Sequence, residues 1–86
     1  MIEDISRFLN ENKQLTVWPK KQNDKLSALK YLVNKFESDR TYTEQEINEI
    51  LKSWHTFNDW PLLRRSLIDY GLMARDINGT QYKRIE

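Results

Sequence analysis

The sequence predicts a mainly α-helical domain that carries a small β-hairpin, within the α+β class. Apolar side chains recur at helical spacing in much of residues 2–70, and after Gly71 the spacing changes to two, around Asn78-Gly79. The chain has 86 residues, of which 38% are hydrophobic and 31% are charged. This length and composition are typical of one soluble domain with a single core.

The N-terminal segment has the pattern of an amphipathic helix over residues 2–10. We therefore expect a helix within residues 1–12, ahead of a larger domain over residues 13–86. Its apolar stripe either packs onto the domain itself or forms an interface with a partner or a second copy of the chain. The members of the stripe are Ile2, Ile5, Phe8 and Leu9.

The next segment is expected to be extended, because Pro19 disfavours helical geometry at the residue before it, Trp18. Trp18 could cover an edge of its own domain or contact a partner. The basic residues Lys20 and Lys21 follow directly. They could touch phosphates, and the alternative is that they only keep the domain soluble.

Two amphipathic helices are predicted in the middle of the chain. The first runs from Asp24, its N-cap, to Glu37. The second covers residues 43–54 and opens with a capping box, in which the Thr43 hydroxyl and the Glu46 carboxylate each accept a bond from the other residue's backbone N–H. Their apolar stripes are Leu26, Leu29, Leu32, Val33 and Phe36 in the first helix and Ile47, Ile50, Leu51 and Trp54 in the second.

A further helix is predicted over residues 59–70, after a turn of about four residues, with Pro61 in its first turn and Gly71 as a left-handed cap. Arg65 lies at the centre of its exposed face, where it could reach a phosphate or a guanine, or make a local ion pair. Arg64 lies nearer the edge and could instead bind a carboxylate on a neighbouring helix. The buried sector consists of Trp60, Leu63, Leu67 and Tyr70.

Residues 72–85 predict a β-hairpin, because polar and apolar side chains alternate on both sides of Asn78-Gly79. Two registers are open. In one, Asn78-Gly79 form a two-residue type I′ turn, and in the other, residues 76–79 form a type I turn with a glycine bulge. The registers differ by one residue, so the sequence leaves open whether Arg75 faces Tyr82.

This order of elements, with a short strand at residues 41–42, is typical of a winged helix-turn-helix domain that has an extra N-terminal helix. Residues 59–70 are then the recognition helix, which enters the DNA major groove, and residues 72–85 are the wing. The alternative is a helical bundle to which a hairpin is attached. The short turn between the last two helices and the position of the hairpin favour the winged interpretation.

A set of short motifs runs through the chain: Trp18-Pro19-Lys20, Tyr42-Thr43-Glu44, Glu46-Ile47-Asn48, Leu63-Arg64-Arg65, Asp69-Tyr70-Gly71-Leu72, Arg75 and Tyr82-Lys83-Arg84. Together they cover about residues 15–86 and resemble a bacterial family of winged-helix-like modules, the domain of unknown function 2087. Members often accompany helix-turn-helix regulators, and many are labelled transcriptional regulators. The resemblance implies the winged fold and a place in transcription regulation.

The charge balance limits how the chain could bind DNA. Lys and Arg together number 14 and Asp and Glu number 13, which gives a formal net charge of +1. Binding to DNA therefore requires local segregation of cations, and Glu44, Glu46 and Glu49 oppose phosphate contact at the start of their helix. The cations expected at a DNA interface are Arg64, Arg65, Arg75, Lys83, Arg84, Lys20 and Lys21.

Other classes of function are excluded by what the chain lacks. It has no cysteine and one histidine, His55, so we expect no metal site, and it has no phosphate-binding loop or nucleophile–base pair. We expect no enzyme activity, cofactor or small-molecule substrate. No apolar run is long enough for a membrane span and the first residues lack a signal-peptide pattern, so we expect a cytoplasmic location.

The leading hypothesis is a regulator that binds double-stranded DNA, as a homodimer or with a partner regulator. The alternative is a protein-interaction module that keeps the winged fold without binding DNA. The near-neutral charge and the acidic helix over residues 43–54 favour this alternative.

Overall fold

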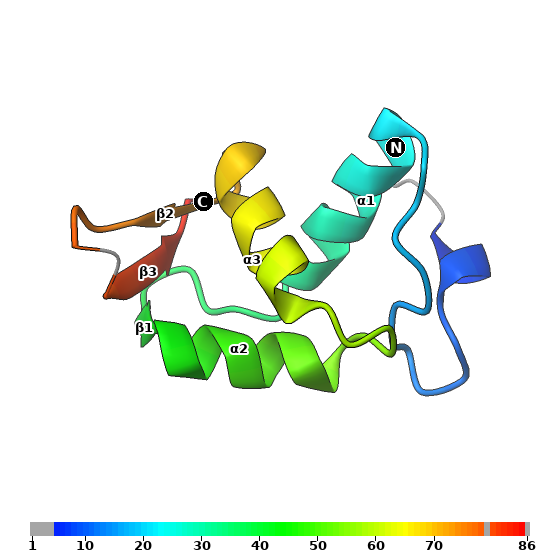
Figure 1. Cartoon of the computed structure of the whole chain (residues 1–86), viewed down its shortest axis with the longest axis horizontal. Coiled ribbons are helices and arrows are strands. Elements are labelled where there is room, and N and C mark those ends of the chain that lie inside the picture. The colour runs from blue at the N-terminus through cyan, green and yellow to red at the C-terminus, as the bar shows by residue number, and fades with distance from the viewer. Residues whose placement is uncertain (1–4, 79, 86) are drawn as a thin grey trace.

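The structure is a computed structural model that describes residues 5–78 and 80–85. Within these residues it has a short 3₁₀ helix, three α-helices and a three-stranded antiparallel sheet (Figure 1). The elements are η1 (Ser6–Phe8), α1 (Gln22–Val33), β1 (Thr41–Thr43), α2 (Glu44–Ser53), α3 (Trp60–Asp69), β2 (Met73–Arg75) and β3 (Gln81–Arg84). The predicted α+β composition is confirmed. None of the helices in the described part has the length and apolarity needed to cross a membrane.

The sheet has the strand order β1-β3-β2, so β3 lies in the centre. Tyr82 of β3 is paired with Tyr42 of β1 on one side and with Arg75 of β2 on the other. The ladder between β2 and β3 ends with a hydrogen bond from Asp76 N to Gln81 O at 3.0 Å. This is the register in which Arg75 faces Tyr82, one of the two that the sequence left open. The type of turn depends on residue 79, which lies outside the described residues.

The hydrophobic core lies between the three helices and one face of the sheet (Figure 1). Its buried side chains include Leu29 and Leu32 of α1, Ile47 and Leu51 of α2, Leu63 and Leu67 of α3, and Tyr42, Met73 and Tyr82 of the sheet. Leu15, from the N-terminal segment, is also fully buried in this core. It is fixed there by bonds from Leu15 N to Trp54 O (2.8 Å) and from Thr56 N to Leu15 O (2.9 Å). The N-terminal segment is thus part of the domain.

The predicted N-terminal helix over residues 2–10 is wrong. Among the described residues of that segment, only Ser6–Phe8 are helical, as a single 3₁₀ turn. The cause is Asn10, whose side-chain oxygen accepts bonds from Asn12 N (2.9 Å) and Gln14 N (3.0 Å) and so stabilises a turn in place of a helix. The turn reverses the chain, and Leu9 then pairs with Leu15 through a β-bridge.

α1 begins and ends earlier than the sequence predicts. Its N-cap is Lys21, not Asp24, and Asp24 lies in the first turn, where a carboxylate favours the positive end of the helix dipole. Arg7 Nη2 lies 2.9 Å from Asp24 Oδ2. Beyond Val33 the chain continues as tight turns, with Phe36 N donating to Val33 O at 3.1 Å. These turns still carry Phe36 into the core.

The start of α2 and the end of α3 are confirmed in detail. Thr43 and Glu46 form the capping box, with Glu46 N donating to Thr43 Oγ1 (3.2 Å) and Thr43 N to Glu46 Oε1 (2.9 Å). Gly71 has a φ of 75°, and its N–H donates to Ile68 O at 3.0 Å. Leu72 N donates to Leu67 O at 2.9 Å, which completes a Schellman motif. These caps fix the two ends of the helix pair from which the candidate site is built.

The turn between α2 and α3 is held by His55, which is only 5% exposed. Its Nδ1 lies 2.6 Å from Leu51 O, and its Nε2 lies 2.9 Å from Asp59 N. Because a carbonyl only accepts and an amide N–H only donates, the ring must donate from Nδ1 and accept at Nε2. His55 is therefore a neutral structural residue, and Asp59 in turn caps α3 by accepting from Leu62 N.

Candidate nucleic-acid interface

A groove of about 540 Å³ lies between α3, the start of α2 and the β2–β3 hairpin. Pro61 and Ile68 supply its apolar parts. Two local features gather its side chains: helical spacing puts several of them on one side of α3, and the strand register puts Arg75 directly opposite Tyr82. The charged and hydroxyl-bearing side chains that line it are Glu44, Arg64, Arg65, Asp69, Arg75 and Tyr82.

Arg65 is the most exposed of the groove arginines on α3, with 83% of its side chain accessible. Its Nε lies 3.5 Å from Asp69 Oδ2, one helical turn further along α3. An exposed ion pair of this length is weak, because water screens both charges. Arg65 can therefore exchange Asp69 for an anionic ligand at little cost.

Arg64 is half-buried and has a different role. Its Nη1 donates to Asn48 Oδ1, so that Arg64 joins α3 to α2. A carboxylate on a neighbouring helix is the partner suggested by the sequence, and in the structure the partner on α2 is the Asn48 amide. A guanidinium has five N–H donors, and the donors that this bond does not use remain on a side chain that lines the groove.

The other side of the groove is formed by Arg75, Tyr82 and Glu44. The Tyr82 hydroxyl donates to Glu44 Oε1 at 3.2 Å, which connects β3 to the first turn of α2. Arg75 is exposed on the same face of the hairpin as Tyr82, since directly paired residues share a face. The groove thus contains three guanidinium groups and two carboxylates, a local excess of one positive charge.

The remaining predicted cations lie elsewhere. Lys83 alternates with the buried Tyr82, so its side chain lies on the outer face of the sheet. Arg84 is bound to the loop after α1, with Nη1 donating to Phe36 O (2.9 Å) and Nη2 to Asn34 Oδ1 (3.1 Å). Lys20 and Lys21 precede α1, whose first turn lies at the far end of the molecule from the hairpin (Figure 1). None of these four is among the residues that line the groove.

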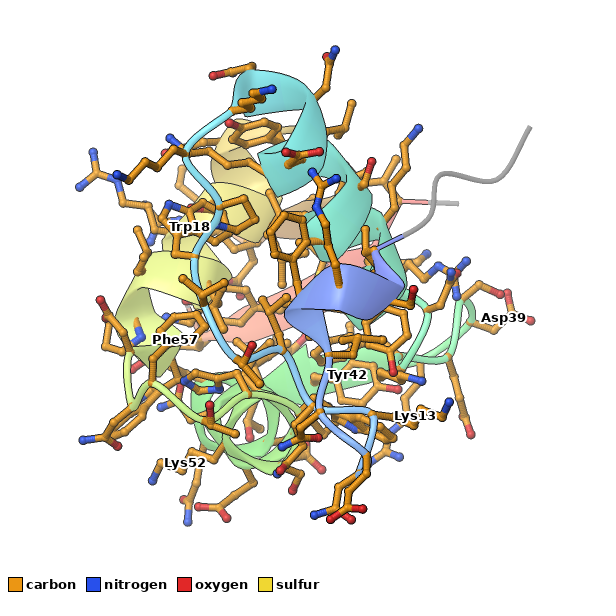
Figure 2. The ribbon with its side chains drawn as sticks, turned by 90° about the vertical axis from the view of Figure 1, so that its right-hand side faces the viewer. Lys13, Trp18, Asp39, Tyr42, Lys52 and Phe57 are labelled. Carbon is orange, nitrogen blue, oxygen red and sulfur yellow. The ribbon has the colours of Figure 1, made fainter. Side chains whose placement is uncertain are left out.

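The residues predicted as an interaction surface are largely used by the domain itself. Ile5 is 7% exposed, and Phe8, Leu9 and Trp18 pack partly buried against the core. Figure 2 shows Trp18 on the N-terminal segment, which runs across the end of the molecule that faces the viewer. Ile2 lies outside the described residues.

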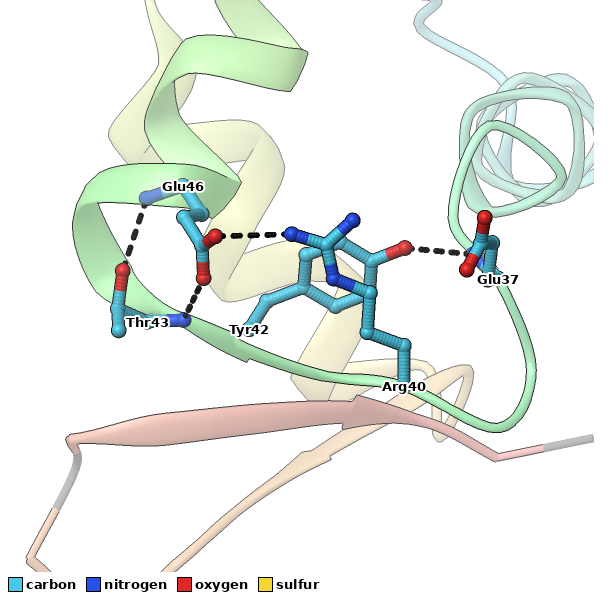
Figure 3. A network of polar contacts seen from close by, with 5 residues as sticks. All are labelled: Glu37, Arg40, Tyr42, Thr43 and Glu46. Carbon is cyan, nitrogen blue, oxygen red and sulfur yellow. Dashed lines mark hydrogen bonds and ion pairs between the residues drawn. The ribbon is translucent and has the colours of Figure 1, made fainter.

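A second polar network surrounds the capping box at the start of α2 (Figure 3). The backbone N–H of Thr43 lowers the pKa of Glu46, partial desolvation opposes this shift, and the Arg40 guanidinium, with Nη2 2.9 Å from Glu46 Oε2, assists it. Arg40 also lies over the Tyr42 ring, and the Tyr42 hydroxyl accepts from Glu37 N at 2.7 Å. The Glu46 charge is thus balanced within the chain, which weakens its repulsion of a phosphate.

Sequence reasoning missed two contributors to the groove. The pairing of Asn48 with Arg64 has no local signal, because the two residues meet only where α2 and α3 cross. The place of Tyr82 in the groove follows from the hairpin register, which the sequence leaves open. The available signal was that Asn48 and Tyr82 each lie within one of the short motifs described above.

Comparison with known proteins gives one family. The family model described as "Uncharacterized protein conserved in bacteria (DUF2087)" matches residues 14–84, which include every element from α1 to β3. No curated protein and no solved structure matches the chain. The matched region contains the whole groove between α3 and the hairpin. Since it also covers most of the sequence, the chain belongs to this bacterial family of uncharacterised domains.

Proposed function

We propose that this protein is a small winged helix-turn-helix protein that binds double-stranded DNA, as a transcription regulator or a module of one. Three features support the fold assignment: the element order α1-β1-α2-α3-β2-β3, the short turn between α2 and α3, and a hairpin that pairs with β1. In this assignment α3 enters the major groove, and the β2–β3 hairpin is the wing that lies along the adjacent backbone.

The observation that carries the proposal is that Arg65 and Arg75 line the same groove. The two residues come from α3 and from the hairpin, the two elements that a winged domain presents to DNA. A guanidinium can bind a phosphate or bind both acceptors of a guanine edge. Arg64 adds a third guanidinium, whose position is set by Asn48.

Three carboxylates near the groove would repel a phosphate unless their charges are balanced. Glu46 is held by Thr43 and Arg40, and Glu44 accepts a bond from the Tyr82 hydroxyl. Asp69 on α3 is paired loosely with Arg65, so its carboxylate would oppose a phosphate bound by that arginine. We therefore expect moderate affinity that depends steeply on salt.

The test is a fluorescence-anisotropy titration of a mixed-sequence duplex at two salt concentrations. Wild-type protein should bind at low salt and weaken as salt increases, because each phosphate contact adds about one unit to the slope of log K against log salt. Arg65→Ala should weaken binding about tenfold or more and reduce that slope.

The matched control is Arg7→Ala. Arg7, like Arg65, is an exposed arginine in an ion pair with an aspartate, but it lies on η1, away from the groove. Arg7→Ala should bind as the wild type does. Undetectable binding of the wild type at micromolar protein and low salt contradicts the proposal.

One observation favours a second function. The groove presents carboxylates beside its arginines, and a surface with both charges suits a protein partner as well as a polyanion. A protein-interaction module with the same fold is therefore the alternative. This alternative predicts no salt-dependent binding to DNA. It also predicts that Arg65→Ala and Asp69→Ala each lose binding to a partner protein.

A further inference from the structure

The tip of the hairpin carries an aliphatic side chain that the fold does not use. Ile77 is fully exposed, at 100%, whereas the other exposed large aliphatic residues in the described part, Val17 and Ile85, are 47% and 44% exposed. A fully exposed isoleucine buries no apolar surface in the fold, so the whole side chain is accessible to a ligand.

The loop that carries Ile77 is held in place by Asp76. Its Oδ1 accepts from Thr80 N (2.8 Å) and Gln81 N (3.3 Å), and its Oδ2 accepts from Thr80 Oγ1 (2.9 Å). With the backbone bond from Asp76 N to Gln81 O, these contacts fix both ends of the loop. The bonds from Thr80 and Gln81 to Asp76 thus close the base of the loop, and Ile77 follows directly after Asp76.

The position of the tip relative to the groove defines what it can reach. Ile77 lies two residues beyond Arg75, which lines the groove that contains Arg65. Figure 1 shows the hairpin extending away from the helices, so that its tip lies at one end of the long axis. When α3 occupies the major groove and Arg75 meets the neighbouring phosphates, the next feature along the DNA surface is the minor groove.

We infer that Ile77 enters the DNA minor groove as an apolar wedge, an inference that rests on the proposed DNA-binding function. The minor groove, about 6 Å wide, admits a single aliphatic side chain. Isoleucine and similar residues in architectural proteins insert between base steps there and kink the duplex toward the major groove. In the present case such a bend brings the DNA closer to the groove arginines.

The experiment compares three full-length proteins, the wild type, Ile77→Ser and Ile85→Ser, on one mixed-sequence duplex with a fluorescent donor and acceptor at its ends. Anisotropy gives the affinity at two salt concentrations, and energy transfer between the ends gives the bend. Ile85→Ser is the matched control, because Ile85 is a second exposed isoleucine, at 44%, and lies at the base of the hairpin. Neither substitution touches the buried core, and circular dichroism checks that both variants fold.

Ile77→Ser should bind about tenfold more weakly, the scale expected when one aliphatic side chain loses its contact. It should bend the duplex less and keep the wild-type salt slope, because isoleucine neutralises no phosphate. Ile85→Ser should match the wild type in all three measurements.

Two results overturn the inference about Ile77 and leave the proposed function intact. In the first, Ile77→Ser binds and bends DNA as the wild type does. In the second, Ile77→Ser and Ile85→Ser lose affinity to the same extent. A wild type without salt-dependent DNA binding overturns the proposed function as well. A salt slope that falls in Ile77→Ser also counts against a wedge, since it indicates a phosphate contact in its place.

Discussion

At the end of the molecule that holds η1, Lys25 and Lys52 lie over aromatic rings of the same chain, whereas in the groove beside the hairpin Arg65 and Arg75 are exposed. Lys25 Nζ is 5.8 Å from the centroid of Trp18, and Lys52 Nζ is 4.3 Å from that of Trp60. Arg65, in contrast, is 83% exposed and only loosely paired. One end uses its polar side chains for stability, and the other has side chains available for a ligand. The following predictions test that difference.

The largest effect is expected at His55, which connects α2 to α3. His55→Ala removes the bond to Leu51 O and leaves Asp59 N without its acceptor, and it also removes the ring that packs edge-on against Phe57. We expect a loss of about 2–4 kcal/mol in the free energy of unfolding, measured with denaturant. A loss below about 1 kcal/mol would show that the turn holds without the ring.

The next effect concerns the N-terminal stripe. Ile5 is buried on its own domain, so Ile5→Ala should lower the free energy of unfolding by about 2 kcal/mol and leave the oligomeric state unchanged in light scattering. Val17→Ala, at a half-exposed position, is the control and should change stability by less than about 0.5 kcal/mol. A change of oligomeric state in Ile5→Ala would instead indicate that the N-terminal stripe forms an interface between copies of the chain.

A smaller effect is expected at the hairpin end from Asp69. Asp69→Asn removes a carboxylate from the groove and releases Arg65, so affinity for duplex DNA should increase about fivefold at low salt. Stability should change by less than about 0.5 kcal/mol, because the pair is exposed. Asp24→Asn, which removes the partner of Arg7 at the other end, should leave the affinity unchanged.

The smallest effect is a pH dependence at Glu46. The hydrogen bond from Thr43 N holds the pKa of the Glu46 carboxyl below its ordinary value, so the ionised carboxylate stabilises the fold above that ordinary pKa. This contribution is lost as the pH falls through the lowered pKa. Glu46→Gln keeps the capping geometry without the charge, since glutamine also completes a capping box.

The melting temperature of the wild type should therefore exceed that of Glu46→Gln at neutral pH. The gap should narrow as the pH falls below about 4.5. A gap that stays constant from neutral pH down to pH 3 would show that the charge of Glu46 does not stabilise the cap.

The parts of the fold that the sequence predicted well are those decided by neighbouring residues. The Thr43–Glu46 box, the Gly71 cap and the hairpin each depend on side chains within a few positions of one another. The N-terminal helix was mispredicted because the apolar spacing does not show that Asn10 stabilises a turn. The pairing of Leu15 with residues 54–56, between distant segments, is likewise shown by no local pattern.

The candidate site was predicted in part for the same reason. Arg64 and Arg65 share a helix, so their proximity could be deduced from helical spacing. The presence of Arg75 beside them depends on the hairpin register and on how the sheet packs against α3. The two bonds of Arg84 to the loop after α1 join residues about fifty positions apart, so the sequence pattern could not show them.

The central position of β3 has a consequence for how the domain assembles. β1 precedes α2, but the strand that pairs with it follows α3, so about 40 residues separate partners such as Tyr42 and Tyr82. Closing that loop has a large entropic cost, so we expect the sheet to form late in folding, after local helical contacts. Until then β1 and β2 each lack their neighbour, and a chain interrupted before β3 leaves both strands open to association with other chains.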